Sequence, residues 1–219
     1  MEIIDKQGRT RMRNVTILRK DDLANNVETG DQRFFVYFHA PSDVRDTVFM
    51  VWKRQVSDDD RWLYLPALDL VRRIAAGEER SSFVGSDFYY EDVSGRSAEE
   101  DTHLLQDTTD TYFVLKSAPK DPSQVEFAYF VSYIHKESYL PVQIEYYQSD
   151  GTKYREYTAE AVETIQGYPT VTRATMKDVL DGGQTTLTYS QIEYDIGLSE
   201  DIFTERYLRN PPRQYLGED

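Results

Sequence analysis

The 219-residue chain contains no cysteine and only three histidines. Without cysteine it can form no disulfide, no thiolate metal site and no thiol nucleophile. The histidines, at positions 39, 103 and 135, lie far apart in the sequence, which argues against a zinc site. A glycine-rich phosphate loop and a dinucleotide fingerprint are also missing. We therefore expect no metal, no cofactor and no catalytic residue.

Long apolar stretches are missing as well, since none reaches the roughly 18 residues that a membrane-spanning helix requires. The first twenty residues are charged where a secretion signal would need an apolar segment. We expect a chain that does not span a membrane and, if the protein is exported, a leader that lies outside this sequence. The formal net charge of −14 disfavours nucleic acid as a partner, because the average surface repels phosphate groups.

Aromatic residues in strand-like runs are what the chain has in abundance. Its 17 tyrosines and 10 phenylalanines suit strands with one buried and one wet face. Short runs rich in Val, Thr, Tyr and Phe alternate with turn residues at the spacing of an antiparallel meander. Asp150-Gly151 and Asp181-Gly182-Gly183 each predict a hairpin between two such runs, and Ser86 to Val93 is a further predicted strand.

Helical signals are few. Ser97 and Glu100 match a capping box and predict a helix that begins at Ser97, and Ser199 to Phe203 predicts a short helical turn. The long helices that parallel strands need are missing. We therefore predict a mostly β fold (α+β), in which a large antiparallel sheet curls into an open, incomplete barrel with a few capping helices. Residues 1–209 are expected to form this single domain, and residues 210–219, with two prolines, a loose tail.

The strand patterns also indicate which side chains face inward. Within Gln32 to Ala40 we place alternate apolar residues toward the interior, because Tyr37 and His39 carry polar tips. With residues of the neighbouring runs they form our candidate lining of an apolar cavity: Phe34, Val36, Phe38, Met50, Trp52, Tyr64 and Phe83.

Arg72 and Arg73 interrupt an apolar stretch, and successive strand residues point to opposite faces, so one of the two is expected on the inner side. A buried guanidinium needs a carboxylate or an anionic ligand group. Asp87 and Asp92 are the expected internal partners. Two interpretations stay open, a structural ion pair and an arginine that holds a ligand head group at the mouth of the cavity.

Several segments, in order along the chain, resemble the bacterial family of outer-membrane lipoprotein-sorting proteins, which is related to the periplasmic lipoprotein carriers LolA and LolB. The matching segments are Ala40-Pro41-Ser42-Asp43-Val44-Arg45, Asp60 to Leu68, Val71 to Ile74, Ser82 to Asp92 and Tyr139-Leu140-Pro141-Val142. The likeness continues through the Asp150-Gly151 hairpin to Phe203 and covers nearly the whole chain.

This resemblance implies an unclosed antiparallel barrel whose concave side accepts acyl chains. It implies a periplasmic carrier or chaperone of an acylated lipid or lipoprotein that serves outer-membrane sorting. Members of the family often accompany RND-type exporters of the MMPL kind, so an accessory interaction module of such an exporter is the alternative. An enzyme of violacein biosynthesis resembles the same fold, which leaves a cofactor-free enzyme as a minor alternative. Family chains carry a leader and an additional N-terminal portion that this sequence is expected to lack.

Overall fold

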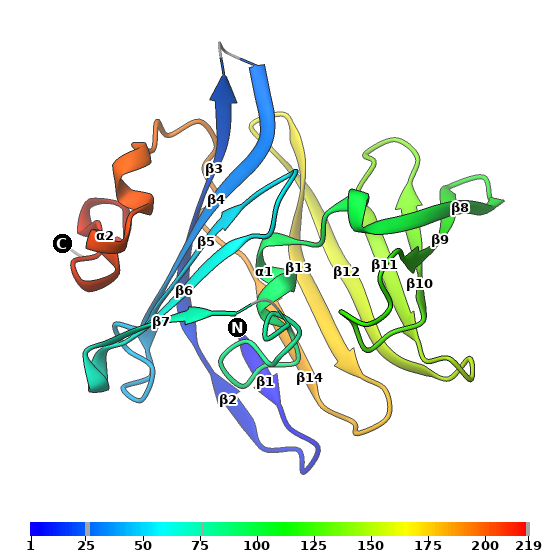
Figure 1. The fold of residues 1–219 in the computed structure, drawn as a ribbon, viewed down its shortest axis with the longest axis horizontal. Coiled ribbons are helices and arrows are strands. Elements are labelled where there is room, and N and C mark those ends of the chain that lie inside the picture. The colour runs from blue at the N-terminus through cyan, green and yellow to red at the C-terminus, as the bar shows by residue number, and fades with distance from the viewer. Residues whose placement is uncertain (25–26, 76, 218–219) are drawn as a thin grey trace. The chain divides into compact units, whose positions relative to one another are not determined.

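The computed structural model describes residues 1–24, 27–75 and 77–217, and it is mostly β. The strands form two antiparallel sheets, of nine and five strands, and neither sheet closes on itself within these residues (Figure 1). This confirms the predicted class, an open arrangement of antiparallel strands with few short helices. By its internal contacts the chain divides into two compact units, one of residues 1–11 and 80–194 and one of residues 12–79 and 195–219.

The first unit carries the nine-stranded sheet. From β8 to β14 each strand lies beside the next strand of the chain, and the predicted hairpins at Asp150-Gly151 and at 181–183 are confirmed. Gly151 has a φ of 84°, a left-handed conformation that favours glycine. In spatial order the strands are β2 (Thr10–Met12), β1 (Glu2–Ile4), β14 (Gln184–Thr188), β13 (Tyr168–Asp178), β12 (Lys153–Ile165), β11 (Pro141–Tyr147), β10 (Tyr129–His135), β9 (Tyr112–Pro119) and β8 (Asp101–Thr108).

The segment between Arg80 and β8 differs from the sequence prediction. Ser86 to Val93 is no strand: it continues a turn and enters the short helix α1 (Tyr90–Ser94). The Asp92 carboxylate accepts a hydrogen bond from the Tyr89 amide, which caps α1 and ends the extended conformation. The predicted strand was wrong because this local cap competes with a strand ladder.

The predicted helix at Ser97 is also shorter than expected. Ser97 forms the capping box with Glu100, but the element is a single 3₁₀ turn, η2 (Ala98–Glu100). Strand β8 begins directly after it at Asp101, whose two carboxylate oxygens accept a bifurcated hydrogen bond from Nε of Arg96. The cap is therefore confirmed, whereas a longer helix is excluded by the start of the edge strand.

The second unit carries the five-stranded sheet, in the order β3 (Asn14–Ala24), β4 (Val27–Ala40), β5 (Val48–Lys53), β6 (Asp60–Leu65) and β7 (Leu70–Ile74). The 3₁₀ turn η1 (Pro66–Leu68) joins the last two strands. The C-terminal segment adds the predicted turn η3 (Glu200–Phe203), the helix α2 (Glu205–Arg209) and the turn η4 (Arg213–Tyr215). Leu216, which lies in the segment expected to be loose, is buried in a hydrophobic core with Met50 and Leu208.

Candidate ligand-binding face and the ion-pair layer beside it

The candidate cavity residues of the second unit lie on two different faces of its sheet. Residue Phe34 pairs with Val51 and residue Phe35 with Met50, so Phe34 and Met50 point to opposite sides. The residues Phe34, Val36 and Phe38 share one face and are buried, whereas Met50, Trp52 and Tyr64 share the other. The register of the strands therefore does not bring these six side chains together on one face.

The face of Met50, Trp52 and Tyr64 is covered by the C-terminal segment. Ile202, Phe203 and Leu208 pack against it in one hydrophobic core. The indole Nε1 of Trp52 donates a hydrogen bond to the carbonyl of Phe203 at 2.7 Å. These three candidate residues therefore serve the core of the second unit. Phe83, the remaining candidate, belongs to the first unit, where it is buried and meets the Tyr90 ring edge to face.

Arg72 and Arg73 are exposed, and their partners are not the expected aspartates. Arg72 pairs with Glu78 at 2.7 Å and Arg73 with Asp60. Asp87 accepts a hydrogen bond from the Thr185 hydroxyl at 2.6 Å. Asp92 is bound instead by Arg155, whose side chain is 3% exposed. The predicted pairing of Arg72 or Arg73 with Asp87 or Asp92 was therefore wrong, because the arginine that reaches Asp92 lies 63 residues further along the chain.

One face of the nine-stranded sheet carries a continuous row of directly opposed, mostly apolar residues that the sequence prediction missed. Because opposed residues of an antiparallel sheet lie on the same face, the pairing alone defines the row. It crosses eight strands, from β8 to β1: Leu105, Leu115, Ser132, Ile144, Tyr157, Met176, Thr185 and Ile3.

Exposure along this row rises toward the β8 edge. Met176 and Ile3 are each 2% exposed, Tyr157 and Ile144 are half-buried, and Leu105 is 55% exposed. The next apolar pair on the same face, Phe113 and Ile134, is also half-buried. The part of the row on β8 to β12, together with Phe113 and Ile134, is thus an apolar sheet face that is not fully covered. We call it the open apolar face. Partly exposed apolar patches of this kind are a feature of binding surfaces.

The buried part of the row is covered by the loop that precedes α1. In this loop, the Asp87 amide donates to the Thr185 hydroxyl at 2.9 Å, and that hydroxyl donates to the Asp87 carboxylate. Nη2 of Arg155, two residues along the strand from Tyr157, donates to the Asp87 carbonyl at 2.8 Å. The loop therefore ends the open apolar face on one side.

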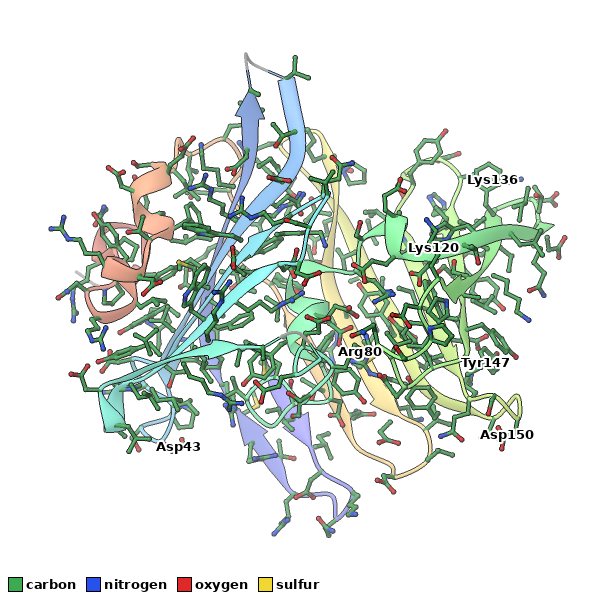
Figure 2. The ribbon with its side chains drawn as sticks, viewed as in Figure 1. Asp43, Arg80, Lys120, Lys136, Tyr147 and Asp150 are labelled. Atoms are coloured by element: carbon green, nitrogen blue, oxygen red, sulfur yellow. The ribbon has the colours of Figure 1, made fainter. Side chains whose placement is uncertain are left out.

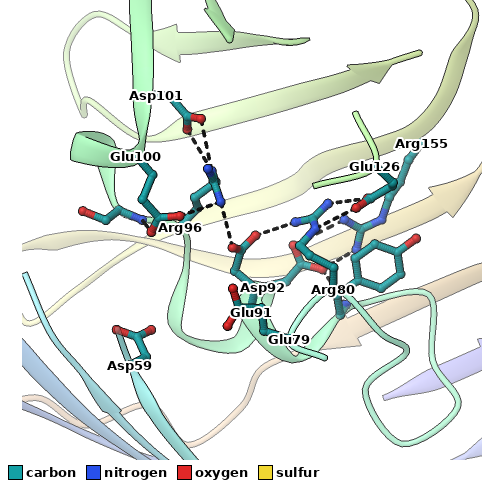
Figure 3. Close-up of polar contacts among 12 residues, drawn as sticks. Asp59, Glu79, Arg80, Glu91, Asp92, Arg96, Glu100, Asp101, Glu126 and Arg155 are labelled. Carbon is teal, nitrogen blue, oxygen red and sulfur yellow. Dashed lines mark hydrogen bonds and ion pairs between the residues drawn. The ribbon is translucent and has the colours of Figure 1, made fainter. Parts of the chain in front are cut away.

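Beside the row lies a layer of buried ion pairs that fastens this loop to the sheet (Figure 3). Arg80 donates two hydrogen bonds to Glu126, at 3.0 and 2.6 Å, and a third to Glu91 at 2.5 Å. Arg96 bridges Glu91 and Asp101. The side chains of Arg80 and Glu91 are only 6% and 4% exposed. Because a buried charge is costly unless it is paired, this reciprocal arrangement points to a structural layer.

The titration of the neighbouring groups supports a structural role. Burial raises the pKa of Tyr146 and of Tyr154 well above the usual range, and the charge of Glu126 adds to this effect at Tyr154. Burial opposes ionisation of Glu126 as well, but the hydrogen bond and charge of Arg80 prevail and lower its pKa. These groups keep one protonation state around pH 7, unlike an acid–base catalyst, whose pKa lies near the working pH.

A polar cavity of about 220 Å³ also lies in the first unit. Four aspartates and two cationic side chains are among the residues that line it: Asp5, Asp87, Asp178, Asp181, Lys6 and Arg11. Most of these groups have partners of their own, since Asp5 binds Arg9, Asp178 accepts from two amides of its turn, and Arg11 donates to the Gly85 carbonyl. Burial raises the pKa of Asp87, against the effect of its hydrogen bond with Thr185.

Two further properties concern only the part of the chain that the structure describes. No three His, Asp or Glu side chains there come close enough together to hold a metal ion. None of the helices there has the length and the apolar character that crossing a membrane requires.

We compared the chain with protein-family models, with curated proteins and with solved structures. Residues 30–210 match the model of a protein family whose description is "Uncharacterized protein". Among curated proteins, no sequence matches the chain. A crystal structure of a DUF1329 family protein from Desulfovibrio piger is 28% identical, with a TM-score of 0.85 over 94% of this chain and 88% of that one.

Two other solved structures are similar. A putative outer membrane lipoprotein-sorting protein domain from Vibrio parahaemolyticus is 27% identical, with a TM-score of 0.82 over 95% of this chain and 88% of that one. A LolA superfamily protein from Nitrosomonas europaea is 19% identical, with a TM-score of 0.69 over 94% of this chain and 87% of that one, and its likeness concerns the fold alone. The predicted resemblance to lipoprotein-sorting proteins and the LolA-like fold are thereby confirmed.

Proposed function

We propose that this chain, which belongs to the protein family whose model matches residues 30–210, is a carrier or chaperone that shields acyl chains of a lipid or lipoprotein. The observation that carries the proposal is the partly exposed apolar row across β8 to β12. This face offers Leu105, Leu115, Ile144 and Tyr157 as contacts for acyl chains. The apolar face is closed at one side by the ion-paired loop, which gives the site a defined boundary.

The energetics suit a carrier that must also release its load. Burial of apolar surface stabilises a complex by roughly 25 cal/mol per Å², so an acyl chain that buries some 200 Å² gains about 5 kcal/mol before the entropic cost of association. This range gives reversible binding rather than permanent capture. A neutral apolar face needs no cofactor and no reaction, and we assign no catalytic step to the site.

The similar lipoprotein-sorting domain from Vibrio parahaemolyticus supports the choice of cargo and place. By this likeness we propose that the protein works in the periplasm, in the sorting of acylated molecules toward the outer membrane. The net charge of −14 fits this setting, because it keeps a carrier with an exposed apolar face soluble and away from anionic lipid surfaces.

Leu105 and Leu104 provide a matched test of the proposal. They are neighbours on the edge strand β8, are 55% and 64% exposed, and oppose Leu115 and Lys116, so they point to opposite faces. We expect Leu105→Gln, alone or with Leu115→Gln, to weaken binding of a fluorescent acyl probe by fivefold or more, as burial of a leucine is worth about 1.5–3 kcal/mol. Leu104→Gln serves as the control and is expected to leave binding unchanged.

Fluorescence titration measures the affinities, and circular dichroism checks that each variant is folded. A wild-type protein that binds no acylated probe contradicts the proposal. An equal loss of affinity in Leu104→Gln and Leu105→Gln also contradicts it, because the two faces are then not distinguished.

A further inference from the structure

The open apolar face has a cationic side chain at its other boundary. Lys136 follows β10 and lies two residues beyond Ile134, a member of the apolar face (Figure 2). Its Nζ is 5.4 Å from the centre of the Phe113 ring, which places it on the same face as Phe113 and Ile134. Nζ also donates a hydrogen bond to the Thr109 carbonyl. The ammonium group is therefore held over the end of the apolar face.

Lys136 differs in one respect from the arginines at the opposite boundary. Arg80, Arg96 and Arg155 each pair with a carboxylate. For Lys136 the described part of the chain supplies a backbone carbonyl and an aromatic ring but no carboxylate within 4.0 Å, the ion-pair distance. An ammonium group has three donors, of which one is used here. Its positive charge is thus available to an anionic group.

The length of the open face fits a molecule with a head and a chain. Lys136 and Phe130 lie six residues apart along β10, which corresponds to about 20 Å of strand. Phe130 pairs with Tyr146, whose ring lies 5.9 Å from the Arg80 guanidinium, so the ion-pair layer begins there. Between these limits the face carries Leu115, Ile134 and Ile144.

We propose that the bound molecule has an anionic head group, a carboxylate or a phosphate, which Lys136 binds while the acyl chain lies along the apolar face toward the ion-pair layer. This inference rests on the proposed function and specifies the class of lipid. In a chain with a net charge of −14, the average surface repels an anion, whereas Lys136 attracts one. The lysine therefore orients the bound lipid with its head group at this end of the face, and it favours anionic lipids over uncharged ones.

The test compares three probes with the same acyl chain: a fatty acid, a lysophosphatidate and an uncharged monoacylglycerol. The wild-type protein is expected to bind both anionic probes about fivefold more tightly than the monoacylglycerol, the magnitude of a partly exposed ion pair. Lys136→Gln is expected to remove this preference and leave the affinity for the monoacylglycerol unchanged, and Lys136→Arg to retain it. Free acetate and free phosphate test whether the head group binds without an acyl chain. Neither is expected to displace the lipid probes at millimolar concentration.

Lys116 provides the matched control. It belongs to the opposite face of the same sheet, where its Nζ lies 3.8 Å from the centre of the Tyr129 ring. Lys116→Gln removes the same charge and is expected to change none of the three affinities. Equal binding of charged and uncharged probes, or a preference that survives Lys136→Gln, overturns the inference and leaves the acyl carrier intact. Failure of all three probes to bind overturns the proposed function instead.

Discussion

Arg80 binds the Glu126 carboxylate through two parallel hydrogen bonds, Nε to Oε2 at 3.0 Å and Nη2 to Oε1 at 2.6 Å. The two residues are 46 positions apart, and the pair joins the loop before α1 to the segment that leads into β10. Nη1 of the same arginine reaches Glu91. Arg80 therefore links the covering loop to the segment before β10, beside the contacts that Thr185 and Arg155 make with the same loop.

Removal of Arg80 should destabilise the protein strongly. Arg80→Met removes one of the two arginines that pair with the buried Glu91 and also the arginine that binds Glu126, and the loss of one member of a buried pair costs about 3–5 kcal/mol. The exposed pair of Arg72 and Glu78 provides the control, since Arg72→Met should cost less than about 1 kcal/mol. Urea unfolding followed by circular dichroism measures both values. Similar costs for the two variants would refute the structural role of the layer.

Glu126 should make stability depend on pH in the acid range. Burial opposes its ionisation, but Arg80 lowers its pKa below the ordinary value. Its contribution to stability is therefore complete above the unfolded-state pKa of about 4.3 and is lost as the pH falls through the lowered value. As the pH falls below about 5, the wild type should lose more stability than Glu126→Gln. Glu99→Gln, which removes an exposed charge, serves as the control and should show the same dependence of stability on pH as the wild type. Identical pH profiles for Glu126→Gln and the wild type would exclude this linkage.

Gly183 should not tolerate a side chain. A Cβ atom there would lie 2.7 Å from Oδ1 of Asp87, a carboxylate that the Thr185 hydroxyl holds in place through its other oxygen. Gly183→Ala is expected to destabilise the protein by about 1–3 kcal/mol through overpacking. In an Asp87→Ala background the same change should cost clearly less, because the obstructing carboxylate is gone. A double-mutant cycle measures the coupling, and additive effects would show that the two positions do not interact.

Leu208 should be essential for the core of the second unit. It is fully buried in α2 against the face that carries Met50. Leu208→Ala is expected to cost about 2–5 kcal/mol, whereas Leu68→Ala, at a position 70% exposed, should cost less than about 0.5 kcal/mol. Thermal unfolding monitored by tryptophan fluorescence reports on the variants directly, because Trp52 and Trp62 belong to this core. Little change in Leu208→Ala would contradict the assignment of the C-terminal segment to the core.

The local features of the fold were predictable from the sequence, because each depends on a few adjacent residues. Asp150-Gly151 forms the expected hairpin, and Ser97 and Ser199 cap the turns that follow them. The prediction failed where a local cap competed with a strand pattern, as at Asp92. It also failed for Phe34 and Met50, whose shared hydrophobicity says nothing about which face each occupies.

The sequence by itself therefore determined an antiparallel, mostly β protein with apolar strand faces and no cysteine chemistry. Only the tertiary structure decided which residues meet, because strand register and ion pairing join positions that are far apart in the chain. A shift of one residue reverses the face of every side chain in a strand, so the row from Leu105 to Tyr157 exists only once five strands are in register. The sequence offers many carboxylates to Arg155, and the fold selects Asp92, since a buried charge requires the partner that packing places beside it.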